Sequence, residues 1–207
     1  MQNTALLLID IQNDFLPANE PGGYDGALAV PEGRAVISVA NQLMEAYELV
    51  VATQDWHPSN HLSFASQHVD ADIGEVVELD GLDQVLWPDH CIQGSYGAEL
   101  ASELDTAAIE FVVQKGTDRR IDSYSGFFDN AWRQATSLEA TLRSRSIDRI
   151  HVMGLATDYC VKFTVLDAID LGFDTSLIRA GCRGVDLNDG DCQAAMNEML
   201  AQGAKFI

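Results

Sequence analysis

The stretch GLATDYCVKFTVLDA, residues 154–168, places a cysteine directly before a segment whose apolar residues recur with helical spacing. Cys160 is either a small buried residue or a nucleophile, because the N–H groups and dipole at the start of a helix stabilise a thiolate. A nucleophilic thiol also needs a base to take its proton and gains from a nearby cation. Asp10 and Lys115 each end an apolar run. Asp10 can serve as the base and Lys115 as the cation. Asp10, Lys115 and Cys160 are therefore a candidate catalytic triad.

A second group of residues has the chemistry of a metal site. Asp55 and His57 in QDWHP are two residues apart, and side chains with this spacing point to the same side of an extended chain. His61 and His90 are candidates for a further ligand. Carboxylate and imidazole ligands together suit zinc, iron or manganese, and the sequence does not choose among these metals.

Short apolar runs alternate with segments of helical periodicity along the chain. The runs suit strands buried on both faces, and they span residues 4–10, 49–55, 111–116, 149–155, 174–180 and 204–207. Helical periodicity covers residues 36–44, 138–142, 161–169 and 194–200. This alternation predicts a single α/β domain over residues 1–207, doubly wound, with a mostly parallel six-stranded sheet and helices on both faces. Because the carboxyl ends of parallel strands meet at one edge, we expect the two groups above to converge there.

Two long segments, residues 55–98 and 116–130, do not fit this alternation. We interpret both as loops, and loops of this length usually serve a binding or catalytic site. The glycine-rich segment 22–26 lacks the spacing of a phosphate-binding loop, so no nucleotide is expected.

The composition is that of an acidic globular protein. Twelve Lys and Arg against 32 Asp and Glu give a formal net charge of −20. This charge repels nucleic-acid phosphates and anionic lipids, so neither nucleic acid nor a membrane is expected as a partner. The first 15 residues lack both a basic start and a long apolar run, so we expect no signal peptide, a cytoplasmic location and four free cysteines.

Six motifs occur in a fixed order: LLLIDIQNDF, QDWHP, WPDHC, QKG, DSYSGF and GLATDYCV. In order and spacing they resemble the nicotinamidases of the isochorismatase-like cysteine hydrolases, from about residue 4 to about residue 180. The resemblance implies the isochorismatase-like hydrolase fold and a metal-dependent cysteine amidohydrolase. Such an enzyme converts nicotinamide to nicotinate and ammonia through a thioester and also accepts pyrazinamide. It would serve NAD salvage.

The resemblance also implies roles for individual residues. It assigns the triad to Asp10, Lys115 and Cys160, and the ligands of one divalent metal ion to Asp55, His57 and His90. It favours zinc over iron or manganese, and it makes His61 a ligand in some family members and not in others. The residues matching the walls of the pyridine pocket are Phe15, Trp87, Tyr124 and Tyr159.

A cis peptide between Leu155 and Ala156 is implied as well, and it would aim the N–H groups of Ala156 and Cys160 into an oxyanion hole. The nucleophilic cysteine sets the chain apart from isochorismate hydrolases, and the metal motif sets it apart from most carbamoyl amidases of the superfamily. An amidase for another small amide and a non-catalytic metal-binding domain remain as alternatives. The sequence leaves a homo-oligomer open.

Overall fold

A six-stranded sheet forms the centre of the computed structural model, which describes residues 3–207. The strand order is β5-β2-β1-β6-β7-β8, and every pairing in this sheet is parallel. The strands are β1 (Thr4–Ile9), β2 (Leu49–Asp55), β5 (Phe111–Lys115), β6 (Arg149–Leu155), β7 (Asp174–Arg183) and β8 (Lys205–Phe206). The predicted six-stranded α/β sheet is confirmed.

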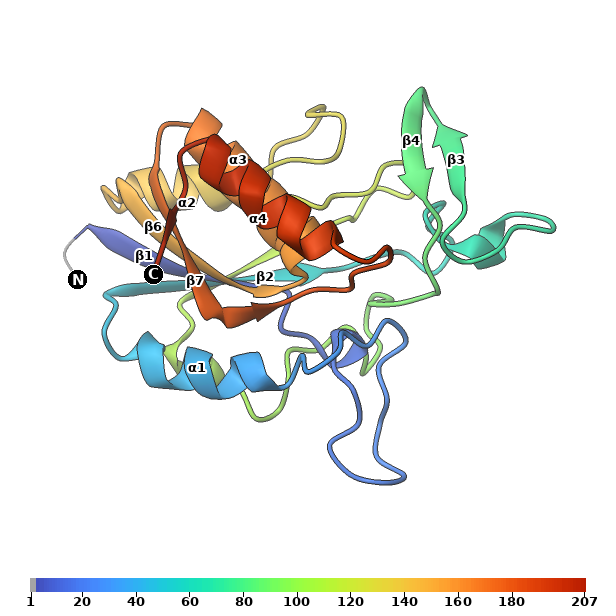
Figure 1. Cartoon of the computed structure of the whole chain (residues 1–207), viewed down its shortest axis with the longest axis horizontal. Helices are drawn as coiled ribbons and strands as arrows, with labels where there is room; N and C mark the ends of the chain where they lie inside the picture. Colours follow the sequence, from blue (N-terminus) through green and yellow to red (C-terminus); the bar gives the residue numbers. More distant parts are fainter. Residues whose placement is uncertain (1–2) are drawn as a thin grey trace.

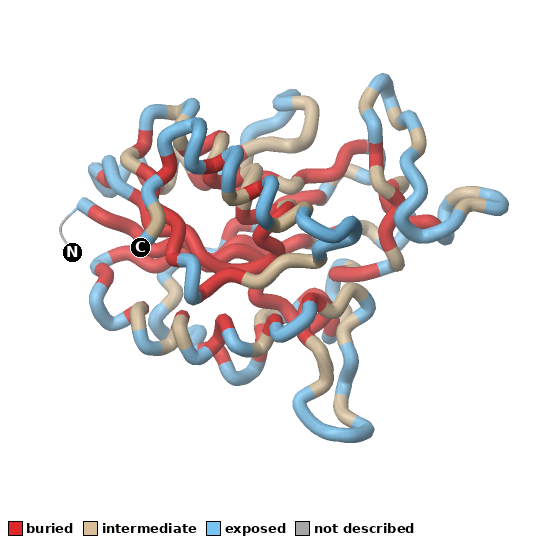
Figure 2. The backbone as a smooth tube through the Cα atoms, viewed as in Figure 1, coloured by how far each residue is buried: buried red, intermediate tan, exposed pale blue. Residues whose placement is uncertain are grey.

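Helices cover both faces of the sheet, as predicted. Helix α1 (Ala35–Met44) lies on one face, and α2 (Leu138–Ser144), α3 (Lys162–Asp170) and α4 (Asp191–Ala201) lie on the other (Figure 1). Every residue of β1 and β2 is consequently buried, which explains why their sequences are continuous apolar runs (Figure 2). No helix within residues 3–207 is long and apolar enough to cross a membrane.

The segment 55–98, interpreted above as a loop, contains an antiparallel hairpin. Its strands are β3 (Val76–Leu79) and β4 (Leu82–Val85), joined by Asp80 and Gly81. Both turn residues have positive φ, 52° and 84°, and an Asp-Gly pair between short apolar strands is a strong hairpin signal. The interpretation as a plain loop was therefore wrong, because this turn signal was not used. Short 3₁₀ turns occupy Asn13–Phe15, Ala65–Gln67 and Thr106–Ala108.

The carboxyl ends of the central strands meet at one edge of the sheet. Asp10 follows β1, Asp55 and Lys115 end β2 and β5, and the π-helical turn η4 (Thr157–Val161) follows β6. Gln12 extends the link between β1 and β2, because its side-chain amide donates to the Asp55 carbonyl and accepts the Asp55 N–H, both at 2.8 Å. The strand ends are thus held in fixed register where the candidate residues lie.

Candidate active site

Lys115 lies at the centre of the candidate triad. Its Nζ is 2.9 Å from Asp10 Oδ2 and 3.4 Å from Cys160 Sγ. The same ammonium donates to Asp55 Oδ1 at 2.6 Å and to the Ser123 carbonyl at 2.8 Å. The side chains of Lys115 and Asp10 are completely buried. The structure therefore brings the three predicted residues together and also ties them to the candidate metal site through Asp55.

Burial sets the resting charges of the triad. Burial disfavours the charged form of Lys115, but Asp10 and Asp55 outweigh that effect and raise its pKa well above the usual value. Burial raises the pKa of Asp10, while Lys115 and Thr53 oppose the rise. Burial also raises the pKa of the Cys160 thiol, against the pull of Lys115. Burial therefore favours the neutral Cys160 thiol and increases the basicity of Asp10, while the two carboxylates favour the Lys115 ammonium.

Thr53 on β2 holds the Asp10 carboxylate in place. Its Oγ1 donates to Asp10 Oδ1 at 2.6 Å and accepts the Asp10 N–H at 3.1 Å. Asp10 has φ of 48°, in the left-handed region that aspartate tolerates better than most residues. This backbone turn at the end of β1 places the carboxylate beside Cys160, whose Sγ lies within 4.8 Å of an Asp10 oxygen.

Asp55, His57 and His90 form a buried cluster next to the triad. Asp55 Oδ2 is 3.6 Å from His57 Nε2 and 3.9 Å from His90 Nε2. The Nδ1 atoms of the two histidines donate to the carbonyls of Gly116 and Pro88, each at 2.8 Å. These bonds leave the Nε2 lone pairs free for a metal ion, the usual arrangement of metal-binding histidine.

Two further observations show that this cluster fits a metal ion. His57 Nε2 is buried and has no hydrogen-bond partner among the described residues. Burial lowers the pKa of His90 to about 4, which keeps its ring neutral. A cation cannot lie equally well between Asp10, Asp55 and Cys160, because the Lys115 ammonium already fills that space.

Gly116 allows the close approach that orients His57. A Cβ at this position would lie 2.4 Å from His57 Cε1, so a side chain is excluded there. Gly116 also has φ of 65°, a conformation that glycine adopts without cost. The glycine of the QKG motif is thus required by the position of the His57 ring rather than by the strand before it.

His61 is buried beside His57, but its hydrogen bonds favour a different tautomer. The Ser63 N–H donates to His61 Nδ1 at 3.1 Å, so this nitrogen is the acceptor. The proton then lies on Nε2, 3.4 Å from the Ile121 carbonyl. In this tautomer Nε2 has no lone pair for a metal. Whether His61 is a ligand stays a prediction to be tested.

Aromatic side chains surround the space in front of Cys160 and His90. All four predicted pocket residues line it, namely Phe15, Trp87, Tyr124 and Tyr159. The ring of Tyr159 makes edge contacts with Trp87 and Tyr124, at centroid separations of 4.9 and 5.4 Å. Aromatic side chains of this kind can pack against a flat ring.

The peptide between Leu155 and Ala156 is cis, as the resemblance implied. It precedes η4, and Ala156 and Cys160 both line the aromatic pocket. The position of these two residues agrees with the expected oxyanion hole, whose role stays a prediction.

A family model described as the Isochorismatase domain matches residues 4–207. The chain belongs to the isochorismatase family. A curated nicotinamidase from Escherichia coli (strain K12) is 52% identical over 99% of this chain and 94% of its own length.

Solved structures of related proteins superpose on this fold. A nicotinamidase and pyrazinamidase from Acinetobacter baumanii superposes with a TM-score of 0.94 at 42% identity, covering 100% of this chain and 96% of its own. A pyrazinamidase from Pyrococcus horikoshii in complex with zinc superposes with a TM-score of 0.77 at 34% identity, covering 99% and 98% of the two chains.

Sequence reasoning missed several residues of this isochorismatase-family site. Leu28, Asp122 and Val185 line the pocket, and Thr53 contacts Asp10. Asp122 belongs to the DSYSGF motif, and its Oδ1 lies 3.9 Å from His57 Nε2. That motif could have drawn attention to Asp122, whereas Leu28 and Val185 lie in loops without any motif.

The hairpin also contributes to the pocket wall. Gln84 of β4 donates from Nε2 to Asp122 Oδ2 and to the Tyr124 hydroxyl, both at 3.3 Å. Trp87 Nε1 donates to the same hydroxyl at 3.2 Å. The missed hairpin therefore orients one aromatic wall and one carboxylate of the site.

Proposed function

We propose that this protein is a nicotinamidase that hydrolyses nicotinamide to nicotinate and ammonia and also accepts pyrazinamide. The observation that carries the proposal is the buried Lys115, which joins the Asp10–Cys160 pair to the metal ligand Asp55 beside one aromatic pocket. The names of the relatives from E. coli and A. baumanii support the same substrates. In this proposal the triad provides the nucleophile, and the metal ligands provide the group that binds the ring. The aromatic pocket explains why the substrate is flat.

Asp10 and Cys160 perform the covalent chemistry. Asp10 takes the thiol proton as Sγ attacks the carboxamide carbon, and it returns that proton to the departing nitrogen so that ammonia leaves and a thioester remains. Asp10 then takes a proton from water, whose oxygen attacks the thioester carbon. The C–S bond breaks, the proton on Asp10 returns to the Cys160 sulfur, and the product leaves as nicotinate once its carboxyl proton passes to ammonia or to solvent.

Lys115 and the cis-peptide turn stabilise charge during these steps. Lys115 stays protonated throughout, since its raised pKa holds the ammonium against the thiolate that forms 3.4 Å away. The N–H groups of Ala156 and Cys160 would bind the oxyanion of the tetrahedral intermediate. In other acyl transfers one such donor contributes about 3–4 kcal/mol.

Asp55, His57 and His90 would hold the divalent metal. The bound ion would supply Lewis acidity toward the pyridine nitrogen of the substrate. Two imidazoles and one carboxylate suit zinc, which the P. horikoshii relative contains, and they accommodate iron or manganese as well. Phe15, Trp87 and the two tyrosines hold the ring so that the carboxamide faces Cys160.

We also propose that residues 1–207 act as one domain in NAD salvage in the cytoplasm. The family match over residues 4–207 supports one domain. A neutral amide substrate suits an acidic protein of net charge −20, whereas anionic nicotinate is not retained by the surrounding field.

Ammonia release from nicotinamide, pyrazinamide and benzamide by the metal-loaded protein tests this function. We expect turnover of the first two amides and little turnover of benzamide, which lacks the ring nitrogen. No turnover of nicotinamide would refute the proposal. Preference for a non-pyridine amide would instead identify an amidase for another small substrate.

Replacing Thr53 should change the pH dependence of the reaction. The Thr53 hydroxyl lowers the pKa of Asp10, so Thr53→Val should raise that pKa further. Because Asp10 must be deprotonated to act as base, activity should then be lost at a higher pH as the solution is acidified. Thr53→Ser keeps the hydroxyl and should leave the acid limb of kcat/KM in place. If the acid limb of kcat/KM in Thr53→Val stays in place or moves to lower pH, Asp10 is excluded as the base.

Asp158 should act as a positioning residue for the pocket. It is buried within η4, and its carboxylate accepts the N–H groups of Val185 at 3.0 Å and Asp186 at 2.7 Å. Asp158→Ala leaves both donors without this partner, so we expect a loss of about 2–4 kcal/mol of stability. Since Val185 lines the pocket, KM for nicotinamide should also rise.

Thermal unfolding and steady-state kinetics measure the two effects. Asp189→Asn, an exposed change in the same segment, is the matched control and should alter neither. If Asp158→Ala lowers stability with KM unchanged, Asp158 has only a structural role.

A further inference from the structure

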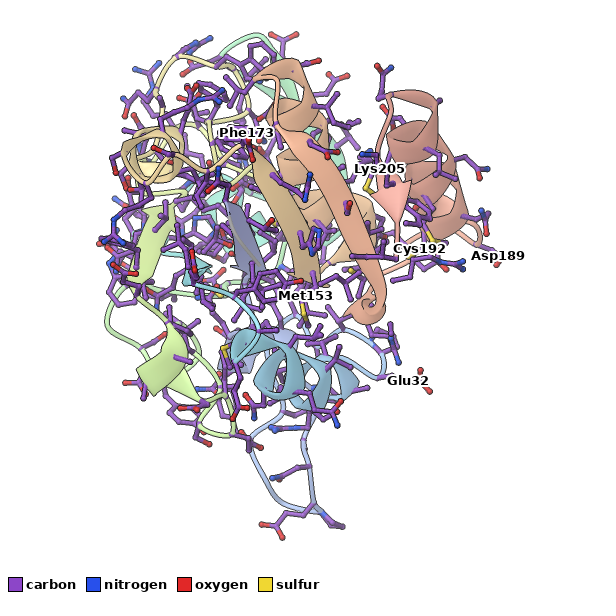
Figure 3. The ribbon with its side chains drawn as sticks, turned by 90° about the vertical axis from the view of Figure 1, so that its left-hand side faces the viewer. Glu32, Met153, Phe173, Asp189, Cys192 and Lys205 are labelled. Atoms are coloured by element: carbon purple, nitrogen blue, oxygen red, sulfur yellow. The ribbon has the colours of Figure 1, made fainter. Side chains whose placement is uncertain are left out.

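A groove of about 680 Å³ lies at the sheet edge, apart from the aromatic pocket. It is bounded by β7, by the two-residue strand β8 and by α4, which lie together at one side of the molecule (Figure 3). Strand β8 pairs with β7 at Ser176 and Leu177, and Ile207 accepts the Arg179 N–H at 3.1 Å, which leaves the last part of β7 without a partner strand on this side. The volume of the groove lies within the range of small-molecule binding sites, roughly 300–1,000 Å³.

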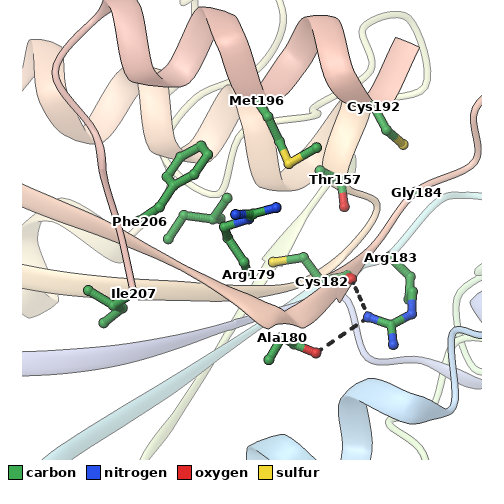
Figure 4. Close-up of a pocket in the computed structure, with 11 residues that line it drawn as sticks. Thr157, Arg179, Ala180, Cys182, Arg183, Gly184, Cys192, Met196, Phe206 and Ile207 are labelled. Carbon is green, nitrogen blue, oxygen red and sulfur yellow. Dashed lines mark hydrogen bonds between the residues drawn. The ribbon is translucent and has the colours of Figure 1, made fainter. Parts of the chain in front are cut away.

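The floor of the groove is apolar, and one cation lies over it. Leu177 is fully buried, while Met196 and Phe206 are half-buried. Figure 4 shows the Arg179 side chain extending beneath Met196, between Phe206 and Cys182. The second arginine, Arg183, is engaged with the carbonyls of Ala180 and Cys182 at 3.4 and 2.7 Å.

Arg179 differs from every other lysine and arginine in residues 3–207. Each of the others has a carboxylate or carbonyl oxygen partner. The Arg179 guanidinium has only the ring of Phe206, 5.8 Å away, among the described residues. In a chain with 32 acidic residues, a cation without an acidic partner over an apolar floor is complementary to an amphipathic anion.

We propose that this groove binds a small monocarboxylate with an apolar body. The carboxylate pairs with the Arg179 guanidinium, whose planar donors suit a carboxylate, and the body lies along Leu177, Met196 and Phe206. The site is separate from the proposed amidase pocket. It shares no lining residue with that pocket, although Thr157 of η4 forms part of its wall.

Hexanoate and 1-hexanol, used as probes at low ionic strength, test this site by titration calorimetry. Wild-type protein should bind hexanoate, with weaker binding as salt is added. Arg179→Gln should weaken hexanoate binding about fivefold and leave 1-hexanol binding unchanged. Arg149→Gln removes the same charge at the opposite end of the sheet and should have no effect. Met196→Glu keeps Arg179 but should abolish binding of both probes.

Nicotinamide turnover by the same variants separates this proposal from the proposed function. Arg179→Gln and Arg149→Gln should retain wild-type turnover, which also shows that they are folded. No hexanoate binding by the wild type, or equal binding by Arg179→Gln, would overturn the proposal. A wild-type dimer in sedimentation that dissociates in Arg179→Gln would also overturn it, because the groove would then be occupied by a second copy.

Discussion

Cys160→Ala should abolish the release of ammonia from nicotinamide. The substitution removes the sulfur that lies 3.4 Å from Lys115 Nζ and within 4.8 Å of an Asp10 oxygen, and no thioester can then form. Loss of a nucleophile from such a triad typically lowers kcat by roughly 10⁴–10⁶-fold. Steady-state measurement of ammonia at saturating nicotinamide would report this loss directly.

Cys192→Ala is the matched control for Cys160→Ala. Cys192 is half-buried on α4, outside the aromatic pocket, so this variant should keep wild-type turnover. Binding of nicotinate by Cys160→Ala should also persist, because the pocket walls and metal ligands remain. Substantial turnover by Cys160→Ala would refute the covalent mechanism while leaving the nicotinamidase assignment intact.

Replacing His57 or His90 by glutamine should remove the metal ion. Each histidine directs a free Nε2 toward Asp55, and its Nδ1 is already committed to a backbone carbonyl. Removing one of these ligands should weaken metal binding by more than about 100-fold, which exceeds the usual effect of losing an outer hydrogen-bond partner. Turnover should fall with metal content, and elemental analysis after dialysis measures that content independently of activity.

The variant His61→Gln tests whether His61 is a metal ligand, a question that the motifs left open. The Ser63 N–H bond to His61 Nδ1 favours the tautomer with the proton on Nε2, so this variant should retain the metal after dialysis. Loss of metal in His61→Gln, to the same extent as in His57→Gln, would show that His61 changes tautomer and becomes a ligand. Retention of metal in all three variants would mean that the ion is bound elsewhere.

The strand and helix pattern could be predicted because both depend on local periodicity. Continuous apolar runs such as Leu49–Asp55 predict strands covered on both faces, and the structure confirms them with small differences at the ends. Strand β7 extends to Arg183, beyond the predicted end at residue 180, through a register shift in its pairing with β6. The hairpin at Asp80 and Gly81 was missed although its turn signal is local.

The site could be predicted in part. Asp10, Lys115 and Cys160 were found because strand ends converge in a parallel sheet, and the family motifs then distinguished His90 from His61. Thr53, Val185 and Leu28 could not be found this way. Their residue types are common in cores and loops, and they join the site only because the folded chain brings them there.

Residue types and their spacing are enough to predict the fold class, the candidate nucleophile and the kinds of ligand available, because these depend on local pattern. The connections between these parts become visible in the folded structure. It places Lys115 between Cys160 and the candidate metal ligand Asp55, and its hydrogen bonds favour opposite tautomers for His57 and His61. The bonds of Lys115 and the bond from His57 to Gly116 join segments far apart in the chain, and periodicity does not encode such contacts.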